Sequence, residues 1–483
     1  MATQFMKAGV LFGLLSFSFA ASSILERGFA PQDIITRDIC IIGGGATGAY
    51  AAVRLREDFN KSVVVVEKTR RLGGHTETFF DPVTGLPVVS LTFSELVFVY
   101  GFRDYGVEAW IDNPTVRAFT SRFNISLVAA VSPPFVTEYI DFKTGKPVTP
   151  SFTQAEVTSA IVTYFQLILQ WPFLVEGYTL PNPVPADLLL TFRDFVNKYG
   201  IQAAIPTILT FVQSVGDLLN TPTIYVVQEF GITQVEAALQ GGFVVAADHF
   251  NSELYLKASG LLGADVLYNT TMVDVARHKI GLQQITVQTP TGRKLIKAKR
   301  ILVTIPPTAD NLKPFTLNHH ESSLFNQWQY TTYYTGIIRN GVPDDVNAIN
   351  AQNGTEFNVP TPPYVQEFSF SGIPGLHTFH TISVKSQTDT DVEKLILSDL
   401  AAMSMAGTFP ASTPSIEVLS NHTPLGLHVT ADSIKNGFYN ALYALQGLKG
   451  TFYTGNAWAG DYTSVLWVFT DALLPGIAAA AAA

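Results

Sequence analysis

Three glycines after an aliphatic run form the first pattern in this chain whose spacing suggests chemistry. Gly43-Gly-Gly45-Ala-Thr-Gly48 satisfies G-x-G-x-x-G at the junction between a short apolar run and a helix-forming stretch. Gly43 would permit the tight turn, Gly45 would let the backbone approach a diphosphate, and Gly48 would allow close packing of helix on strand. The pattern therefore predicts a dinucleotide-binding turn.

Two further features belong to the same prediction. The unpaired amides and the dipole at the helix start, at Ala46 and Thr47, favour a bound diphosphate. Glu67 ends a second aliphatic run, where an acidic side chain can accept hydrogen bonds from ribose hydroxyls, and Lys68 follows it. A glycine-rich turn with a surface glutamate is the alternative. The glycines and the glutamate stand in register, which favours the dinucleotide.

The residues that follow distinguish between dinucleotides. Glu67-Lys-Thr-Arg-Arg-Leu-Gly-Gly-His75 has the form E-x-x-x-R-x-G-G-x, which resembles the two-glycine signature of FAD enzymes of the glutathione reductase and amine oxidase type. The resemblance places Arg71 near the pyrophosphate and brings the backbone of Gly73 and Gly74 close to the cofactor. His75 lies beside them. An ordinary turn after a basic stretch is the alternative.

The elements that position these residues can be expected from the hydrophobic pattern. Residues 38–42 and 62–67 are aliphatic runs on either side of a helix over 46–58. Runs that are apolar on both faces indicate parallel strands buried between layers, so the chain opens with a βαβ unit. Later patterns predict helices over 154–170, 187–199, 247–262 and 464–474, strands over 266–275 and 450–454, and a hairpin of 284–288 with 294–304.

Motifs spread over most of the chain resemble the flavin-containing amine oxidoreductase superfamily. Within it, the chain is similar to fungal secreted FAD oxidoreductases of the beta-cyclopiazonate dehydrogenase type. Besides the two glycine motifs, the resemblance rests on Asp104-Tyr-Gly-Val107, Ile305-Pro-Pro307, Tyr333-Tyr-Thr-Gly336, Gly455 and Ser464-Val-Leu-Trp467. It implies an α/β fold with an α+β two-domain layout: a Rossmann-type FAD-binding domain of the amine oxidase/glutathione reductase type, and a substrate domain of mixed sheet and helices.

The resemblance also assigns later residues to the cofactor site. Gly106 and Val107 would lie near the isoalloxazine ring. Met272 would offer its backbone to adenine, with an ordinary core position as the alternative. Gly455 and Asn456 would approach the ribityl phosphate.

The start of the last helix and one strand end carry the remaining candidates. By the resemblance, the amides of Ser464 and Val465 would face the pyrimidine oxygen of the flavin and stabilise negative charge as it is reduced. Amine-oxidising relatives often carry a lysine near flavin N5, whereas the corresponding strand end here has Arg339. Arg339 is the one candidate catalytic residue, with a solvated strand-end charge as the alternative. The spacing of the histidines singles none of them out as an acid or base.

One segment departs from the resembling family. After a Gly-x-Pro like Gly85-Leu-Pro87 the family runs almost directly into the Asp-Tyr-Gly-Val stretch, whereas here the strongly apolar residues from Val88 to Arg103 intervene. A family-specific loop or non-coding sequence retained in the gene model would each explain this. Continuous transcript reads through the segment would exclude the second explanation.

Composition excludes several other classes of function. The 483 residues are 47% hydrophobic and 14% charged, with a formal net charge of −9 and no basic run, which argues against nucleic acid as a partner. The single cysteine, Cys40, excludes internal disulfides and cysteine-based zinc sites, and we predict no metal. Cys40 lies inside the first strand and His75 is interpreted as a hydrogen-bonding residue, so we expect non-covalent FAD.

The N-terminus has the pattern of a targeting signal. Within residues 1–20, Lys7 precedes an apolar run that ends in small residues, which predicts a secretory signal peptide rather than a membrane anchor, because the run is shorter than the roughly 20 residues of a membrane span. The chain also has N-x-S/T sequons at Asn60, Asn124, Asn269, Asn353 and Asn421. We therefore expect a secreted or lumenal glycoprotein with no membrane span in the mature chain.

The expected organisation interleaves the two domains. The FAD-binding domain would take segments 36–115, 231–310 and 421–477, and the substrate domain a helical segment 116–230 and a sheet segment 311–420. The expected function is an FAD-dependent oxidoreductase that oxidises a C–N or C–H bond of a small, largely apolar substrate and passes electrons to oxygen or another acceptor. The resemblance implies oxidation or oxidative cyclisation in secondary metabolism. A secreted amine or amino-acid oxidase that produces hydrogen peroxide, and a non-catalytic binding module on the same fold, are the alternatives; no oligomeric state is implied.

Overall fold

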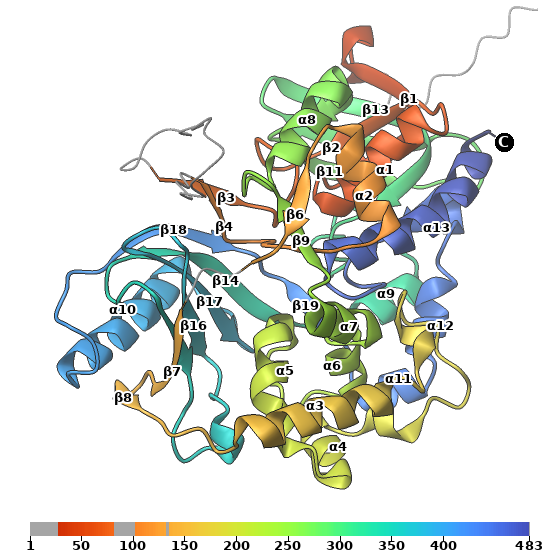
Figure 1. Ribbon diagram of the computed structural model, residues 1–483. Coiled ribbons are helices and arrows are strands. Elements are labelled where there is room, and N and C mark those ends of the chain that lie inside the picture. Colours follow the sequence, from red (N-terminus) through yellow and green to blue (C-terminus); the bar gives the residue numbers. More distant parts are fainter. Residues whose placement is uncertain (1–27, 82–101, 132–134, 483) are drawn as a thin grey trace, which may run out of the picture.

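Two large sheets organise the computed structural model (Figure 1). The structure describes residues 28–81, 102–131 and 135–482. The predicted signal peptide therefore lies outside the described residues. So does most of the apolar segment 88–103, whose last two residues begin β4 (Phe102–Asp104).

The first sheet has seven strands and confirms the predicted βαβ unit. β1 pairs in parallel with β2, so that Ile39 lies opposite Val63 and Ile42 opposite Val66. All four residues of β2 are buried valines, as expected for a strand covered on both faces. The strand order is β10-β2-β1-β13-β12-β11, with β20 beside β13, and the bounds are β1 (Ile34–Ile42), β2 (Val63–Val66), β10 (Val266–Leu267), β11 (Thr271–Ala276), β12 (Gln283–Thr289), β13 (Gly292–Val303) and β20 (Thr451–Tyr453).

Most of the elements predicted in and around this sheet are found, but two of the predictions need correction. The hairpin of β12 with β13 is confirmed, and so is the return of the chain end, because β20 pairs in parallel with β13. The strand predicted over 266–275 is two strands, β10 and β11, because the chain turns at Asn269, whose φ is +49°. Helix α8 (Glu253–Leu262) begins later than predicted, because the Asn251 side chain accepts a hydrogen bond from the Ala246 amide and holds a turn there.

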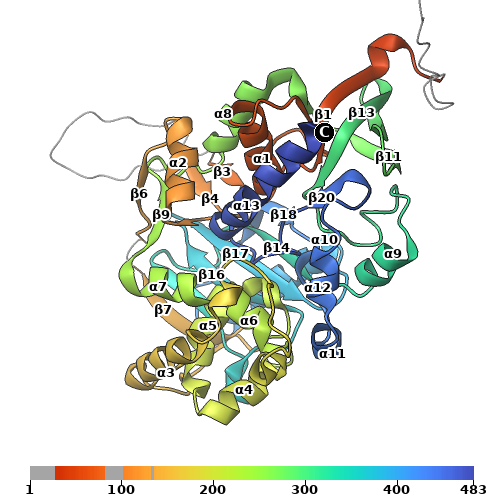
Figure 2. The ribbon, with the colours of Figure 1, turned by 90° about the vertical axis from the view of Figure 1, so that its right-hand side faces the viewer.

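The C-terminal helix α13 (Thr463–Ala482) packs along α1 (Ala46–Glu57), as Figures 1 and 2 both show. Trp467 stacks on Tyr50 at a centroid distance of 5.2 Å, and Asp471 forms an ion pair of 2.7 Å with Arg54. The terminal alanines extend this helix, and Ala481 is buried. By length and composition α13 resembles a membrane span, but in this structure its apolar side faces α1.

The second sheet has eight strands, and α10 (Asp389–Met405) covers one of its faces. The predicted sheet segment supplies most of it. Its far edge, however, is β7 and β8, which come from the segment predicted as helical; β7 pairs in parallel with β15, with Val136 opposite Val346 and Ile140 opposite Asn350. The order is β18-β14-β17-β16-β15-β7-β8, with β19 beside β14: β7 (Val136–Asp141), β8 (Lys146–Pro147), β14 (Gln329–Arg339), β15 (Val346–Asn350), β16 (Tyr364–Phe370), β17 (Leu376–Ser383), β18 (Ser415–Asn421) and β19 (Leu425–His428).

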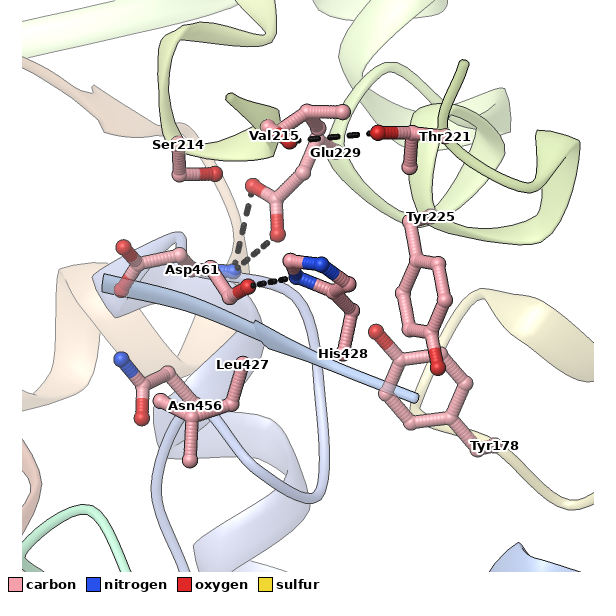
Figure 3. Close-up of a pocket in the computed structure, with 11 residues that line it drawn as sticks. Tyr178, Ser214, Val215, Thr221, Tyr225, Glu229, Leu427, His428, Asn456 and Asp461 are labelled. Atoms are coloured by element: carbon pink, nitrogen blue, oxygen red, sulfur yellow. Dashed lines mark hydrogen bonds between the residues drawn. The ribbon is translucent and has the colours of Figure 1, made fainter. Parts of the chain in front are cut away.

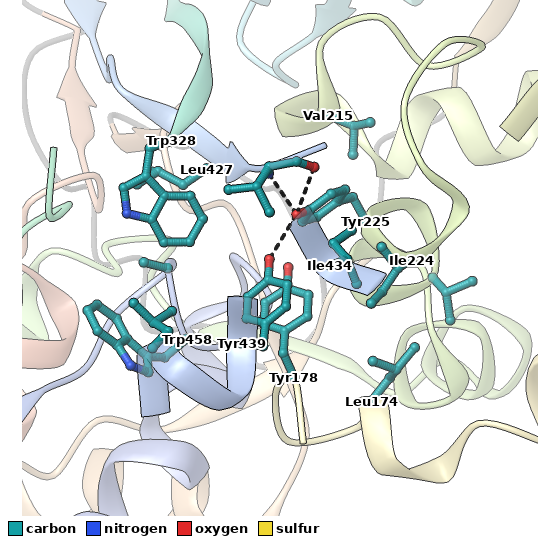
Figure 4. Close-up of a cluster of buried hydrophobic side chains, with 14 of the residues drawn as sticks. Leu174, Tyr178, Val215, Ile224, Tyr225, Trp328, Leu427, Ile434, Tyr439 and Trp458 are labelled. Atoms are coloured by element: carbon teal, nitrogen blue, oxygen red, sulfur yellow. Dashed lines mark hydrogen bonds between the residues drawn. The ribbon is translucent and has the colours of Figure 1, made fainter. Parts of the chain in front are cut away.

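A helical unit lies beside this sheet and below the first one in Figure 1. Its core contains a tyrosine cluster: Tyr439 donates a hydrogen bond of 3.0 Å to the hydroxyl of Tyr225 and stacks on Tyr178 at 4.0 Å (Figure 4). The helices are α3 (Gln154–Ile168), α4 (Phe192–Tyr199), α5 (Ile205–Phe211), α6 (Thr223–Glu229), α7 (Ile232–Gln240), α9 (His319–Phe325), α11 (Ala431–Lys435) and α12 (Phe438–Tyr443).

Two short sheets and one helix complete the strands and α-helices of the described residues. β3 (Thr78–Phe80) pairs with β4 between the large sheets. The other short sheet joins segments far apart in the sequence, in the order β5 (Trp110–Ile111), β9 (Phe243–Ala246) and β6 (Leu127–Ala129), and α2 (Pro114–Arg122) lies between β5 and β6 in the chain.

Candidate functional site

The first glycine turn joins β1 to α1 and leaves no room for side chains at two of its positions. Gly43 has φ +105°, and a Cβ there would lie 2.7 Å from side-chain atoms of Thr304 and Ile305. A Cβ on Gly48 would lie 2.0 Å from the carbonyl oxygen of Gly43. Glycine is therefore required at both positions for the turn and for the packing of α1 on the sheet.

Gly45 differs from its neighbours because the space beside it is open. It has φ −62°, which any residue adopts, and a Cβ there would meet only the Cα of Gly74, at 4.0 Å. Gly45 is the N-cap of α1 and provides no side-chain cap, while Gly45 and Ala46 are partly exposed and Thr47 is buried. An open, uncapped helix N-terminus without acidic residues in its first turn fits a diphosphate.

Glu67 lies directly under the glycine turn. Its carboxylate is buried and accepts hydrogen bonds of 2.7 Å from the amides of Gly44 and Thr69. A carboxylate has about four acceptor sites, so these two bonds leave capacity for ribose hydroxyls. Thr270 lies just before the edge strand β11, and its amide donates a hydrogen bond to the Glu67 carbonyl. Met272 follows on β11. The residue expected to contact adenine, Met272, therefore lies near the residue expected to contact ribose, Glu67. The side chain of Lys68 is exposed.

The second glycine motif packs against the first. The Gly73 amide donates a 2.9 Å hydrogen bond to the Gly44 carbonyl, and a Cβ on Gly74 would lie 2.9 Å from the Cα of Gly45. Arg71 holds this loop together, because its guanidinium donates to the carbonyls of Gly74 and Thr76 at 2.7 and 3.0 Å. The structure thus places Arg71 beside the two glycine turns, with its donors used within the loop.

A stacked pair of histidines links this loop to the second sheet. The ring of His75 lies 4.1 Å from that of His422, at an interplanar angle of 7°. His422 Nε2 lies 3.0 Å from Glu77 Oε2, and because a carboxylate only accepts, this nitrogen carries the proton. Burial opposes ionisation of Glu77, but His422 and Arg71 outweigh it and lower the pKa of Glu77 to about 2. Burial and the neighbouring His422 hold the pKa of His75 well below its usual value, so His75 is neutral.

The residues assigned to the isoalloxazine lie on the same loop. The Val107 amide donates a 3.1 Å hydrogen bond to the His75 carbonyl, and a Cβ on Gly106 would lie 2.0 Å from that oxygen. The Asn251 amide group donates to the Val107 carbonyl at 3.2 Å. The structure therefore brings Gly106, Val107 and His75 together.

The C-terminal candidates are held near the end of the first sheet. Gly455 follows β20 with φ +112°. The Ser464 hydroxyl accepts a hydrogen bond of 2.8 Å from the Ile111 amide, which fixes the start of α13. The Val465 amide donates to the Tyr462 carbonyl at 2.9 Å, so it is already engaged in the first turn. Asn456 lines a small pocket together with Asp461 and His428 (Figure 3).

Arg339 lies at the end of β14 in two ion pairs. Its guanidinium lies 2.7 Å from Asp81, whose side chain is fully buried, and 3.4 Å from Glu417. The side chain of Arg339 itself is 20% exposed. The structure thus places this residue in a charge network at the strand end, and its catalytic role stays a prediction.

One group of hydrogen-bonded side chains was not predicted from the sequence. It lies on the face of the second sheet that is turned toward the glycine loops. Tyr333 donates a 2.8 Å hydrogen bond to Gln213 Oε1, so His380 Nδ1, at 2.7 Å, must be the donor to the Tyr333 oxygen. Burial and the nearby His422 lower the pKa of His380 to about 3. Glu367 lies 3.9 Å from His380 Nε2, and burial, with the charge of Glu108, raises the pKa of Glu367 to about 7.

No cluster of metal-ligating side chains occurs in the part of the chain that the structure describes. Cys40 is fully buried in β1, and burial raises the pKa of its thiol. A buried, protonated thiol in a central strand is a packing residue.

Comparison with known proteins shows which family the chain belongs to. A family model described as an NAD(P)-binding Rossmann-like domain matches residues 41–122. Beta-cyclopiazonate dehydrogenase of Aspergillus oryzae is 34% identical over 466 residues, which cover 96% of this chain and 98% of the relative. The chain belongs to this family of FAD-dependent oxidoreductases. The FAD-dependent oxidoreductase pigF of Monascus ruber is 35% identical over 460 residues, which cover 94% of each chain.

Solved structures show the same fold for this oxidoreductase at much lower identity. A fatty acid isomerase of P. acnes covers 91% of the chain with a TM-score of 0.71 and 17% identity, and 98% of that protein is covered. Putrescine oxidase has a TM-score of 0.60 at 15% identity, and the match covers 92% of this chain and all of that one. These solved structures show that the chain shares the fold of putrescine oxidase, and the relatives above identify it as an FAD-dependent oxidoreductase, so the non-catalytic alternative is set aside.

Proposed function

We propose that this oxidoreductase oxidises a C–N or C–H bond of a small, largely apolar substrate in fungal secondary metabolism, by removing a hydride from carbon and a proton from a neighbouring atom. The single observation that supports the proposal is a contact between two parts of the structure. Residues 71–77 and 105–107, which are expected to lie near FAD, contact one face of the second sheet. Thr335 on β14 donates to the Tyr105 carbonyl, and His422, just after β18, contacts Glu77 on the loop. A substrate held on this sheet face therefore lies next to the residues expected to surround the flavin.

FAD supplies the acceptor for the hydride that leaves the substrate. The chain supplies position and proton handling. Tyr333 and His380 provide a neutral hydrogen-bonded pair on the buried sheet face, and Glu367, with its pKa near neutral, is suited to take or give one proton next to them. His380 stays neutral, because its pKa lies far below that of Glu367, so it orients Tyr333 and does not take the proton from Glu367. The substrate bond that loses a proton would point toward the side chains of Tyr333, His380 and Glu367.

Beta-cyclopiazonate dehydrogenase is named for a dehydrogenation, and we infer a related oxidation or oxidative cyclisation here. The test is anaerobic mixing of the flavin-loaded enzyme with beta-cyclopiazonate and with a panel of simple amines and amino acids. We expect the visible flavin absorption to bleach with the first and to persist with the panel. Bleaching by the amines, with hydrogen peroxide on readmission of air, would instead support the secreted amine oxidase.

The electron acceptor and the state of the cofactor are also part of the proposal. We infer that oxygen or another acceptor reoxidises the enzyme and that FAD is held non-covalently. The buried thiol of Cys40 in β1 supports the second point, because it lies inside the first sheet. The ring of His75 stacks on that of His422, which supports the expectation that His75 does not anchor the flavin covalently.

We also propose that the protein enters the secretory pathway and is glycosylated. The asparagines of all five sequons are exposed in the structure: Asn60, Asn124, Asn269, Asn353 and Asn421. Exposure is required for a glycan, which is bulky and hydrated. Digestion of the protein from a secreting eukaryotic host with peptide N-glycosidase should lower its mass, and an unchanged mass would contradict this proposal.

A further inference from the structure

Helix α8 begins beside the loop that is expected to border the isoalloxazine ring. The pairing of β3 with β4 continues beyond these strands, as far as the hydrogen bond of 3.1 Å from the Val107 amide to the His75 carbonyl. Residues 75–80 and 102–107 therefore form one two-stranded ribbon, which we call the flavin ribbon. Its position depends on what holds it from outside.

Two residues at the start of α8 hold both strands of the flavin ribbon. The Ser252 hydroxyl donates to the Thr76 carbonyl at 3.2 Å and accepts from the Thr78 hydroxyl at 2.9 Å. Asn251 is fully buried, and its backbone amide donates to the carboxylate of Asp104, whose two oxygens lie at 3.2 and 3.3 Å. Ser252 thus fixes the first strand of the ribbon and Asn251 fixes the second.

The side chain of Asn251 uses both ends of its amide group. Its Oδ1 accepts from the Ala246 amide at 3.0 Å, and its Nδ2 donates to the carbonyls of Val107 and Glu108 at 3.2 and 3.0 Å. Because a backbone amide donates and a carbonyl accepts, these partners also determine which side-chain atom is the nitrogen. Asn251 therefore connects the end of β9 to the end of the flavin ribbon.

The two bonds from Nδ2 determine where the carbonyl oxygens of Val107 and Glu108 point. A carbonyl oxygen carries partial negative charge, and reduction adds negative charge to a flavin ring. An oxygen turned toward the ring would therefore disfavour the reduced form. A buried carbonyl that loses its donor costs free energy until it finds another partner, so removing Nδ2 would release both oxygens from their present directions.

We propose that Asn251 is a positioning residue of the flavin site: it keeps the Val107 and Glu108 carbonyls turned away from the isoalloxazine ring and thereby raises the reduction potential of bound FAD. Asn251 acts through the backbone of this segment and is not a catalytic residue. The inference goes beyond the proposed function, because it holds for any substrate. It depends on the expected place of the ring beside Gly106 and Val107.

The midpoint potential of bound FAD, measured by stepwise reduction in the presence of a reference dye, tests the inference without a substrate. In Asn251→Ala we expect the potential to fall by about 30 mV or more. For two electrons this corresponds to about a tenfold weaker preference of the protein for reduced over oxidised flavin. Asn251→Ser should act in the same direction, because serine is polar but too short to reach both carbonyls, and it keeps the test decisive if the alanine variant does not fold.

Asn440→Ala is the matched control, since Asn440 is exposed on α12, and it should keep the wild-type potential. A lower melting temperature in the Asn251 variants with an unchanged potential would show a purely structural role and overturn the inference. A raised potential would overturn it as well.

Val107→Ala separates the two ways in which the inference can fail. If this variant shifts the potential while the Asn251 variants do not, the ring lies where expected and Asn251 does not set its potential. If none of these variants shifts the potential, the ring does not lie beside this segment, and the inference fails with its placement. A wild-type protein that binds no FAD would refute the inference together with the assignment of the cofactor.

Discussion

Replacing Gly45 by valine is expected to give a folded protein that carries no flavin. The backbone at this position has φ −62°, and a Cβ would meet only the Cα of Gly74, so the substitution costs the fold little. The new side chain would instead occupy the open space at the α1 N-terminus, where a diphosphate must approach the backbone. We expect FAD affinity to fall about 100-fold or more, measured by flavin released per protein and by titration of the apoprotein with FAD.

Gly48→Val is the informative comparison for this result. A Cβ at Gly48 would lie 2.0 Å from the Gly43 carbonyl oxygen, so α1 could not keep its place on the sheet. We expect this variant to unfold at lower temperature or to be insoluble. If Gly45→Val retained wild-type flavin content, the diphosphate would not lie at this helix start. If it unfolded like Gly48→Val, the assignment of open space beside Gly45 would be wrong.

Glu67→Gln is expected to weaken FAD binding by about 10- to 100-fold without unfolding the protein. Glutamine keeps one acceptor oxygen for the amide of Gly44 or Thr69, which the carboxylate now binds at 2.7 Å each. It loses the charge that strengthens hydrogen bonds to the ribose hydroxyls, and a hydrogen bond to a charged group is worth about 1.5–3 kcal/mol. The dissociation constant is measured by flavin fluorescence quenching on titration of the apoprotein.

The control for Glu67 is Glu57→Gln, because Glu57 lies exposed at the end of the same helix α1. Its FAD affinity should match the wild type. An unchanged dissociation constant in Glu67→Gln would contradict a ribose contact. The role of Glu67 would then be to hold the glycine turn in place through its hydrogen bond with Gly44. A loss of folding in Glu67→Gln would show that the Gly44 and Thr69 bonds dominate its role.

The first domain could be predicted well because its signals are local. The glycine turn, the valines of β2 and the hairpin at Gly292 each depend on neighbours in the sequence. The strand β7 was missed because its polar and apolar residues do not alternate and only its last two residues are buried, so its pairing with β15 rather than its own pattern defines it as a strand. The start of α8 was misplaced because the turn before it depends on the Asn251 side chain, which a helical pattern does not reveal.

The cofactor residues could be named from motifs, whereas the substrate side could not. His422 meets Glu77 and His75 only because β18 places it beside a loop several hundred residues earlier. The spacing of the histidines gave no reason to prefer His380, whose partner Tyr333 lies on a neighbouring strand.

The visible absorption spectrum of the purified protein, recorded before and after acid precipitation, tests the central claim most directly. We predict a yellow protein whose flavin is released into the supernatant by acid, as expected for FAD held by the glycine loops and Glu67 without a covalent bond. Colour retained in the pellet would contradict non-covalent binding and turn attention to His75. A colourless protein that stays colourless after incubation with FAD would contradict the assignment of this chain as a working flavoenzyme.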